Sequence, residues 1–302
     1  MSVTLTTAPT PVTQARPAEG ASSINHPRHP PATARRLSAY RAGAGDPLVL
    51  LHGFGESHIG WRPVIDALAA EYDVIAIDLP GFGRSPALPP QVAPTAGNLA
   101  AAVQDTLDDL GVGDYHVAGY SLGARVGIHL AGSDRVRSVI AISPDGLSTP
   151  PERVGAYVAL LAARGVAKAL APVAGQLSRT AVGRCVFFAG NRSLPWQLAP
   201  ADARELLTGV AHAPGYHATN WAAIFDLPTH LHTITAPVLF LQGTAEPLIA
   251  QQSHRYLPFI PGARLRWLPG ANHVPISDDP SAVAAHMLAF LNQAPRGPVT
   301  TF

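Results

Sequence analysis

The chain has 302 residues, of which 47% are hydrophobic and 14% charged, enough apolar side chains to fill a sizeable core. Its 21 Lys and Arg balance 20 Asp and Glu, and a formal net charge of +1 gives no reason to expect nucleic acid or a membrane as a partner. The single cysteine, Cys185, cannot form an internal disulfide, so an oxidising compartment is not indicated.

Residues 1–35 are rich in Pro, Thr, Ala and Ser, and this composition predicts a disordered N-terminal extension. The extension lacks the apolar core of a signal peptide. We find no apolar run that approaches the roughly 18 residues needed to span a bilayer. We therefore expect a cytoplasmic protein with no membrane-spanning segment.

From Leu48 onward, short apolar runs end in turn residues, and segments with helical patterning lie between them. Runs rich in Val, Ile and Leu predict strands that are buried on both faces, as in a parallel sheet. The alternation predicts an α/β fold with crossover helices. The expected strands are 47–51, 73–77, 115–119, 136–142, 238–241 and 264–268, and the expected helices are 61–71, 95–110, 122–131 and 280–292.

This alternation stops between residues 147 and 232, where several helices separated by Gly and Pro are expected instead. We interpret residues 147–232 as a helical cap inserted into a core formed by 36–146 and 233–295. Four aromatic residues of the cap could line a substrate pocket or pack in the cap's own core: Trp196, Tyr216, Trp221 and Phe225.

The segment Gly119–Gly123 reads G-x-S-x-G, with Ser121 at its centre, between an expected strand and an expected helix. In that context the pattern predicts a sharp strand-to-helix turn that exposes a nucleophilic serine. Glycine is needed on both sides because side chains there would crowd the turn. The alternative is a serine that only caps an ordinary helix.

Three further segments complete a resemblance to the α/β-hydrolase superfamily over about residues 36–291: His52–Gly55, Asp78–Ser85 and Asn272–Pro275. They resemble the HG-x-G loop, the D-x-P-G-x-G-x-S loop and the G-H-x-P segment of that superfamily, with Asn272 in place of the usual glycine. The resemblance implies an eight-stranded, mostly parallel sheet flanked by helices, with the cap inserted after strand six.

A catalytic triad follows from the same resemblance. His273 lies in a loop after an apolar strand and would act as the base that activates Ser121. The acid usually follows the strand 238–241, where this chain has Glu246, and we favour that residue. Asp145, which follows the strand 136–142, is the alternative, since both carboxylates precede His273 in the chain.

The resemblance also places an oxyanion hole at the backbone N–H groups of Phe54 and Leu122. No cofactor is expected. The histidine pairs 230/232 and 212/217 lack nearby Cys or carboxylate partners, so no metal site is expected either.

These features predict a serine hydrolase that cleaves an ester or related acyl bond of a small, apolar substrate through an acyl-serine intermediate. Carbon–carbon bond hydrolysis and cofactor-free perhydrolase activity use the same triad and stay open, as does a non-catalytic member that only binds a ligand. The sequence is silent on oligomeric state.

Overall fold

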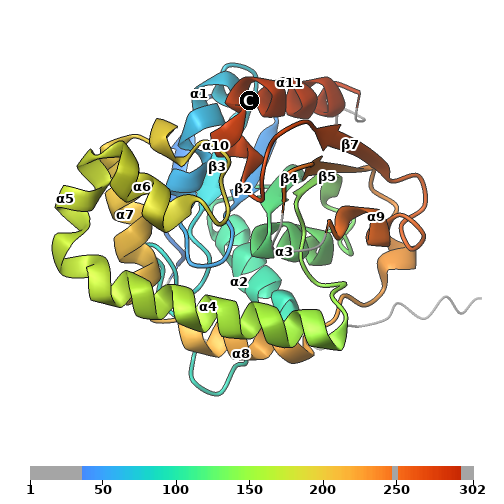
Figure 1. The fold of residues 1–302 in the computed structure, drawn as a ribbon. Helices are drawn as coiled ribbons and strands as arrows, with labels where there is room; N and C mark the ends of the chain where they lie inside the picture. Colours follow the sequence, from blue (N-terminus) through green and yellow to red (C-terminus); the bar gives the residue numbers. More distant parts are fainter. Residues whose placement is uncertain (1–35, 247–250, 294–302) are drawn as a thin grey trace, which may run out of the picture. The chain divides into compact units, whose positions relative to one another are not determined.

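A seven-stranded sheet lies at the centre of the part of the chain described by the computed structural model, residues 36–246 and 251–293 (Figure 1). Its strand order is β1-β3-β2-β4-β5-β6-β7, and only the β1–β3 pair is antiparallel. The strands are β1 (Ala39–Ala42), β2 (Pro47–Leu51), β3 (Asp73–Ile77), β4 (Tyr115–Tyr120), β5 (Val136–Ile142), β6 (Val238–Gly243) and β7 (Arg264–Leu268).

This sheet confirms the expected α/β-hydrolase fold, although two details differ from the expectation. Within the described ranges we find seven strands, and β1 pairs at the edge without a further strand beside it. The helical insertion follows the fifth of these strands, β5. Neither the count of eight strands nor a cap after strand six is therefore confirmed. The extension expected to be disordered, residues 1–35, lies outside the described residues.

Helices pack on both faces of the sheet because successive strand residues point in opposite directions. In β2, Val49 and Leu51 join the core under α2 (Ala96–Asp109) and α3 (Leu122–Leu130). Leu48 and Leu50 join the opposite core, under α1 (Arg62–Ala69) and α11 (Pro280–Leu291). Three short helices complete this part: η1 (His58–Trp61), α9 (Ser253–Tyr256) and α10 (Pro275–Asp278).

The insertion between β5 and β6 is helical, as expected from the sequence. Its longest helix, α4, begins with a capping box in which Thr149 and Glu152 satisfy each other's backbone N–H groups. The elements are α4 (Pro150–Leu170), η2 (Ala171–Val173), α5 (Ala174–Arg179), α6 (Ala181–Phe188), η3 (Pro195–Gln197), α7 (Pro200–His212), α8 (Tyr216–Phe225) and η4 (Leu231–Thr233). The division of the chain into core and cap at residues 147 and 232 stays a prediction.

One part of this insertion departs from the sequence expectation. The helical stretch Pro150–Arg179 is long and apolar enough to cross a membrane, and only 11% of its most apolar window is buried. The expectation that no apolar run approaches this length is therefore wrong. Arg164 and Lys168 interrupt the run in the sequence, but the surrounding Ala, Val and Leu outweigh these two charges.

Candidate active site

Ser121 occupies the turn between β4 and α3, in a backbone conformation that a residue with a side chain rarely adopts (φ 54°, ψ −122°). The neighbouring glycines make this turn sterically possible. A Cβ on Gly119 would lie 2.2 Å from the carbonyl oxygen of Gly123, and a Cβ on Gly123 would lie 2.2 Å from that of Leu51. The backbone therefore holds the serine at the carboxyl end of β4 and at the first turn of α3.

The loop after β2 lies directly against this serine. A Cβ on Gly53 would be 3.2 Å from Cβ of Ser121. The buried His52 ring fixes the loop: its Nε2 accepts from the Leu79 N–H at 2.8 Å, so its Nδ1 carries the proton and donates to the Gly53 carbonyl at 2.8 Å. Burial lowers the pKa of His52, which keeps the ring neutral in this structural role.

Phe54 and Leu122 line the same cavity as Ser121. Leu122 is the first residue of α3, so its N–H has no acceptor within the helix. The Phe54 ring packs edge-on against Tyr216, 4.5 Å between centroids, and against Phe82 at 5.4 Å. These contacts hold the backbone of the loop in place. The assignment of the two N–H groups to an oxyanion hole stays a prediction.

His273 lies in the loop after β7, and its imidazole Nδ1 is 2.6 Å from Oε1 of Glu246. The Glu246 side chain is almost fully buried, and its second oxygen accepts from the Gln242 amide. Gln242 is in turn fixed by the Ser253 hydroxyl, which donates to its Oε1 at 2.6 Å. The loops are pressed together, since a Cβ on Gly243 would be 2.3 Å from the Ala271 carbonyl oxygen. The sequence-predicted base and the favoured acid are thus neighbours.

Asp145, the alternative acid, has a different partner. Its Oδ2 lies 3.6 Å from one guanidinium nitrogen of the buried Arg125. The other terminal nitrogen of that guanidinium lies 3.4 Å from Oδ2 of Asp226. Within the described ranges, the other Asp145 oxygen is buried without a hydrogen-bond partner. Asp145 therefore belongs to a charged cluster, and Glu246 holds the position beside His273.

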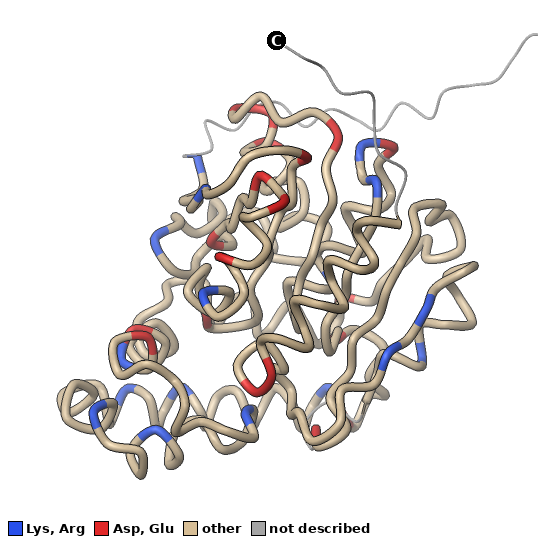
Figure 2. Tube along the Cα trace, turned by 90° about the horizontal axis from the view of Figure 1, so that it is seen from above, with Lys and Arg blue, Asp and Glu red and all other residues tan. Residues whose placement is uncertain are grey.

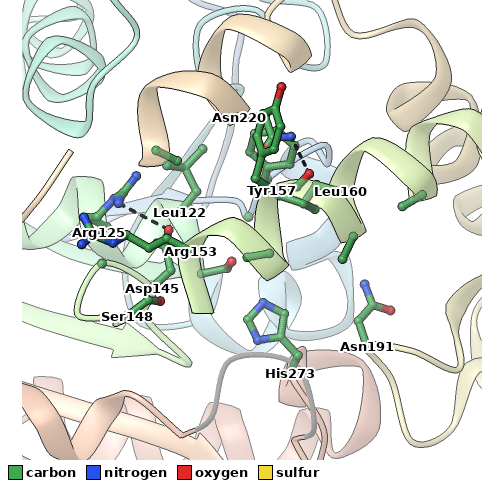
Figure 3. A pocket seen from close by; sticks show the side chains of 18 of the residues that line it. Leu122, Arg125, Asp145, Ser148, Arg153, Tyr157, Leu160, Asn191, Asn220 and His273 are labelled. Carbon is green, nitrogen blue, oxygen red and sulfur yellow. Dashed lines mark hydrogen bonds and ion pairs between the residues drawn. The ribbon is translucent and has the colours of Figure 1, made fainter. Parts of the chain in front are cut away.

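A cavity of about 400 Å³ joins Ser121 and His273 to the insertion (Figure 3). Its walls are largely apolar, and residues of α4 and α8 supply them: Ala156, Ala159, Leu160, Ala163, Ala223 and Ile224. Arg125, Asp145 and Arg153 lie together on one side, where Figure 3 draws them away from His273. Two buried nitrogens there, the Nε atoms of Arg125 and Arg153, have no partner among the described residues.

A family model described as the alpha/beta hydrolase family matches residues 48–286. The chain belongs to this family. The match includes the Ser121 turn, the loop after β2 and the His273 loop.

Comparisons with individual proteins agree with this membership. Pimeloyl-[acyl-carrier protein] methyl ester esterase of Aeromonas hydrophila subsp. hydrophila is 30% identical over 259 residues, which cover 81% of this chain and 94% of that one. The dihydrolipoyllysine-residue acetyltransferase component of the acetoin cleaving system of Cupriavidus necator is 36% identical over 110 residues, and there the match spans only 29% of the relative. The structure of an esterase from Thermogutta terrifontis has a TM-score of 0.66 at 22% identity, with 85% of this chain and 93% of that chain covered, which shows a shared fold.

The hydrolase also contains a buried ion pair that sequence reasoning missed. Arg192, from the insertion, donates to Oε1 of Glu56 at 2.8 Å, and the Tyr120 hydroxyl donates to the other oxygen at 2.6 Å. Burial alone raises the pKa of Glu56, but Arg192 and Tyr120 outweigh it and the pKa is lowered. The insertion is thereby connected, through Glu56, to Tyr120, the residue preceding Ser121. Only the position of Glu56, shortly after the HG-x-G loop, could have hinted at it.

The insertion holds the histidine loop of the hydrolase through a second set of contacts. The Asp278 carboxylate accepts from the N–H groups of Ser193 and Asn272, both at 2.8 Å. The Asn272 side chain accepts from the His273 N–H at 2.7 Å. The replacement of the usual glycine by Asn272 therefore adds a hydrogen bond next to the expected base.

Across the described ranges no group of three or more His, Cys, Asp or Glu side chains could hold a metal ion.

Proposed function

We propose that this hydrolase cleaves carboxylic esters through an acyl intermediate on Ser121. The observation that carries the proposal is that Ser121 and His273 line one cavity while Nδ1 of His273 is 2.6 Å from a buried carboxylate. The Aeromonas relative is named as a methyl ester esterase, and this name supports an ester as the bond that is cleaved.

The chemistry follows from the order of these contacts. Nδ1–H of His273 donates to Glu246, which leaves Nε2 unprotonated and able to take the proton of Ser121. The serine oxygen attacks the ester carbonyl carbon, and the oxyanion accepts from the N–H groups of Phe54 and Leu122. His273 returns the proton to the alcohol as the ester bond breaks. Water then attacks the acyl-serine with the same base, releasing the acid and restoring Ser121.

In this proposal Glu246 orients the imidazole and stabilises its protonated form. Glu246→Gln should lower kcat by about 10³–10⁴-fold, as loss of a triad acid does in other hydrolases. Asp145→Asn keeps the side-chain shape in the Arg125 cluster and should retain kcat within about tenfold. A large loss in Asp145→Asn alone would assign the acid to Asp145.

The cavity walls favour an apolar acyl or alcohol group, because Ala, Leu and Ile side chains of α4 and α8 offer few hydrogen-bond partners. The buried Nε atoms of Arg125 and Arg153 favour an acceptor group at the far end of the substrate. Turnover of a panel of esters, lactones and diketones, with and without peroxide, separates ester cleavage from carbon–carbon hydrolysis and perhydrolysis.

A fluorophosphonate probe tests the nucleophile. We expect one covalent label per folded chain in the parent protein and none in Ser121→Ala, with loss of ester turnover in that variant. Ser148→Ala is the matched control, because Ser148 lines the same cavity and its hydroxyl accepts from the Gln252 amide, outside the His273–Glu246 contact. A folded parent protein that takes no label would support the ligand-binding alternative.

A further inference from the structure

The helical insertion exposes large apolar side chains that no part of the described protein covers. Val154 and Val158 of α4 are 55% and 56% exposed, and Trp221 and Phe225 of α8 are 56% and 68% exposed. Trp221 and Phe225 line a second, open hollow beside the segment 87–95, and they do not line the cavity at Ser121. An apolar surface of this kind marks an interaction site.

These side chains come from two neighbouring helices, since α4 and α8 lie side by side and antiparallel (Figure 1). Three hydrogen bonds fix the alignment: Tyr216 to the Leu160 carbonyl, Asn220 to the Tyr157 carbonyl, and Arg153 to the Ile224 carbonyl.

Aromatic rings of the two helices contact one another. Tyr157 and Trp221 are 5.9 Å apart, and Trp221 and Phe225 are 5.4 Å apart. Helical periodicity places Val154 and Val158 on the side of α4 opposite Ala156 and Leu160, which line the cavity. We call Val154, Val158, Trp221 and Phe225 the insertion's apolar face.

The charged residues of the insertion are mostly basic, although Glu152 of α4 and Asp226 after α8 stand next to the apolar face in the chain. Although the chain as a whole has a formal net charge of +1, residues 147–232 hold seven Lys or Arg against four Asp or Glu; two of the seven, Arg164 and Arg192, are buried. Lys168 and Arg179 are exposed, and the helices along the lower left of Figure 2 carry several basic positions.

We propose that the insertion's apolar face docks in the plane of an anionic lipid bilayer. Exposed Trp and Phe beside Val suit the boundary between headgroups and acyl chains, and the exposed Lys168 and Arg179 farther along the insertion suit anionic headgroups. A second copy of this chain fits less well, since a two-fold contact would bring the same basic surfaces together. The long apolar helix then lies on the membrane with its other side forming the cavity wall.

Vesicle co-sedimentation tests the proposal without any need for turnover. The probes are vesicles of phosphatidylcholine alone and vesicles containing about 30% phosphatidylglycerol. We expect the full-length protein to bind the anionic vesicles and to lose binding as salt rises. Val158→Ser/Phe225→Ser should lower the partition coefficient at least tenfold. The matched control Phe259→Ser/Trp267→Ser, which removes two exposed apolar side chains elsewhere, should retain it.

Charge reversal gives an independent readout. Lys168→Glu/Arg179→Glu should lower binding to anionic vesicles by about 25-fold or more, from about fivefold for each cation near such a surface. Arg84→Glu/Arg266→Glu carries the same charge change on exposed residues outside the insertion and should bind as the parent does.

Two results would overturn the proposal. One is the absence of binding by the folded parent protein to either vesicle. The other is self-association that Val158→Ser/Phe225→Ser abolishes in sedimentation velocity with no vesicle binding, which would assign the face to a second copy.

Discussion

Substituting Arg192 tests how much the buried ion pair between Arg192 of the insertion and Glu56 contributes to stability. Glu56 also accepts from Tyr120, the residue before Ser121. The Arg192 side chain is 0% exposed and that of Glu56 is 7% exposed, so Arg192→Met leaves a charged carboxylate without its cation in a dry site. Breaking such a pair costs about 3–5 kcal/mol. For a domain of this size each kcal/mol shifts Tm by about 2–4 °C, so thermal unfolding should begin roughly 6–20 °C lower.

The loss should also depend on pH. With Arg192 present, the pKa of Glu56 is lowered, and the stability from its charged form is present above the unfolded pKa and lost as pH falls through the folded pKa. Without Arg192, burial raises the folded pKa of Glu56. The deficit of Arg192→Met should therefore shrink as pH falls towards the unfolded carboxyl pKa, where the buried group is neutral.

Urea unfolding at two pH values, followed by circular dichroism, measures both effects. Arg41→Met is the matched control, because the Arg41–Asp73 pair is formed by an arginine that is 51% exposed and should cost about 0–1 kcal/mol. Glu56→Gln combined with Arg192→Met should recover part of the loss, since no charge is then left unpaired. Equal losses in Arg192→Met and Arg41→Met, with no pH dependence, would refute the reasoning.

Three further predictions test the site and its support. Gly123→Ala places a Cβ 2.2 Å from the Leu51 carbonyl oxygen. It should lower the free energy of unfolding in urea by about 1–3 kcal/mol and ester turnover at least tenfold. In the control Gly113→Ala the new Cβ meets nothing within 4 Å, and both stability and turnover should stay as in the parent. Asn272→Gly removes the acceptor of the His273 N–H and should lower kcat about tenfold with little change in KM; an unchanged kcat would mean that the loop is held without it. Burial lowers the pKa of His116 to about 4, so stability should fall as pH drops from about 6.5 towards 4, and His116→Gln should flatten that dependence in pH-dependent unfolding; a slope as steep as the parent's would contradict this assignment.

The sheet and the nucleophile turn could be predicted from the sequence because both depend on local patterns. Runs of Val, Ile and Leu identify strands that are buried on both faces, and β2 through β6 lie where those runs predict. The glycines beside Ser121 follow from the sterics of one turn. The six apolar runs missed β1, because this edge strand is exposed and lacks a continuous apolar run, and the count of eight came from the resemblance alone.

The support around the site could not be predicted, because it depends on contacts between residues far apart in the chain. The Arg192–Glu56 pair spans 136 positions, and no local pattern indicates which arginine meets which carboxylate. Order in the chain could not decide between Glu246 and Asp145, because both precede His273, and only the position implied by the resemblance favoured Glu246. The structure places Glu246 beside His273 and Asp145 beside Arg125. The exposure of α4 could not be predicted, because the sequence shows an apolar helix but not which of its sides other elements cover.

The most direct test of the proposed mechanism is to trap the acyl intermediate. The protein reacts with an ester that deacylates slowly, the reaction is quenched rapidly, and peptide mass spectrometry locates the acyl group. We predict that the acyl mass appears on the peptide containing Ser121 and at a rate matching the first release of alcohol. Turnover of the ester with Ser121 unmodified, or with the acyl group on Cys185 or another side chain, would contradict the mechanism.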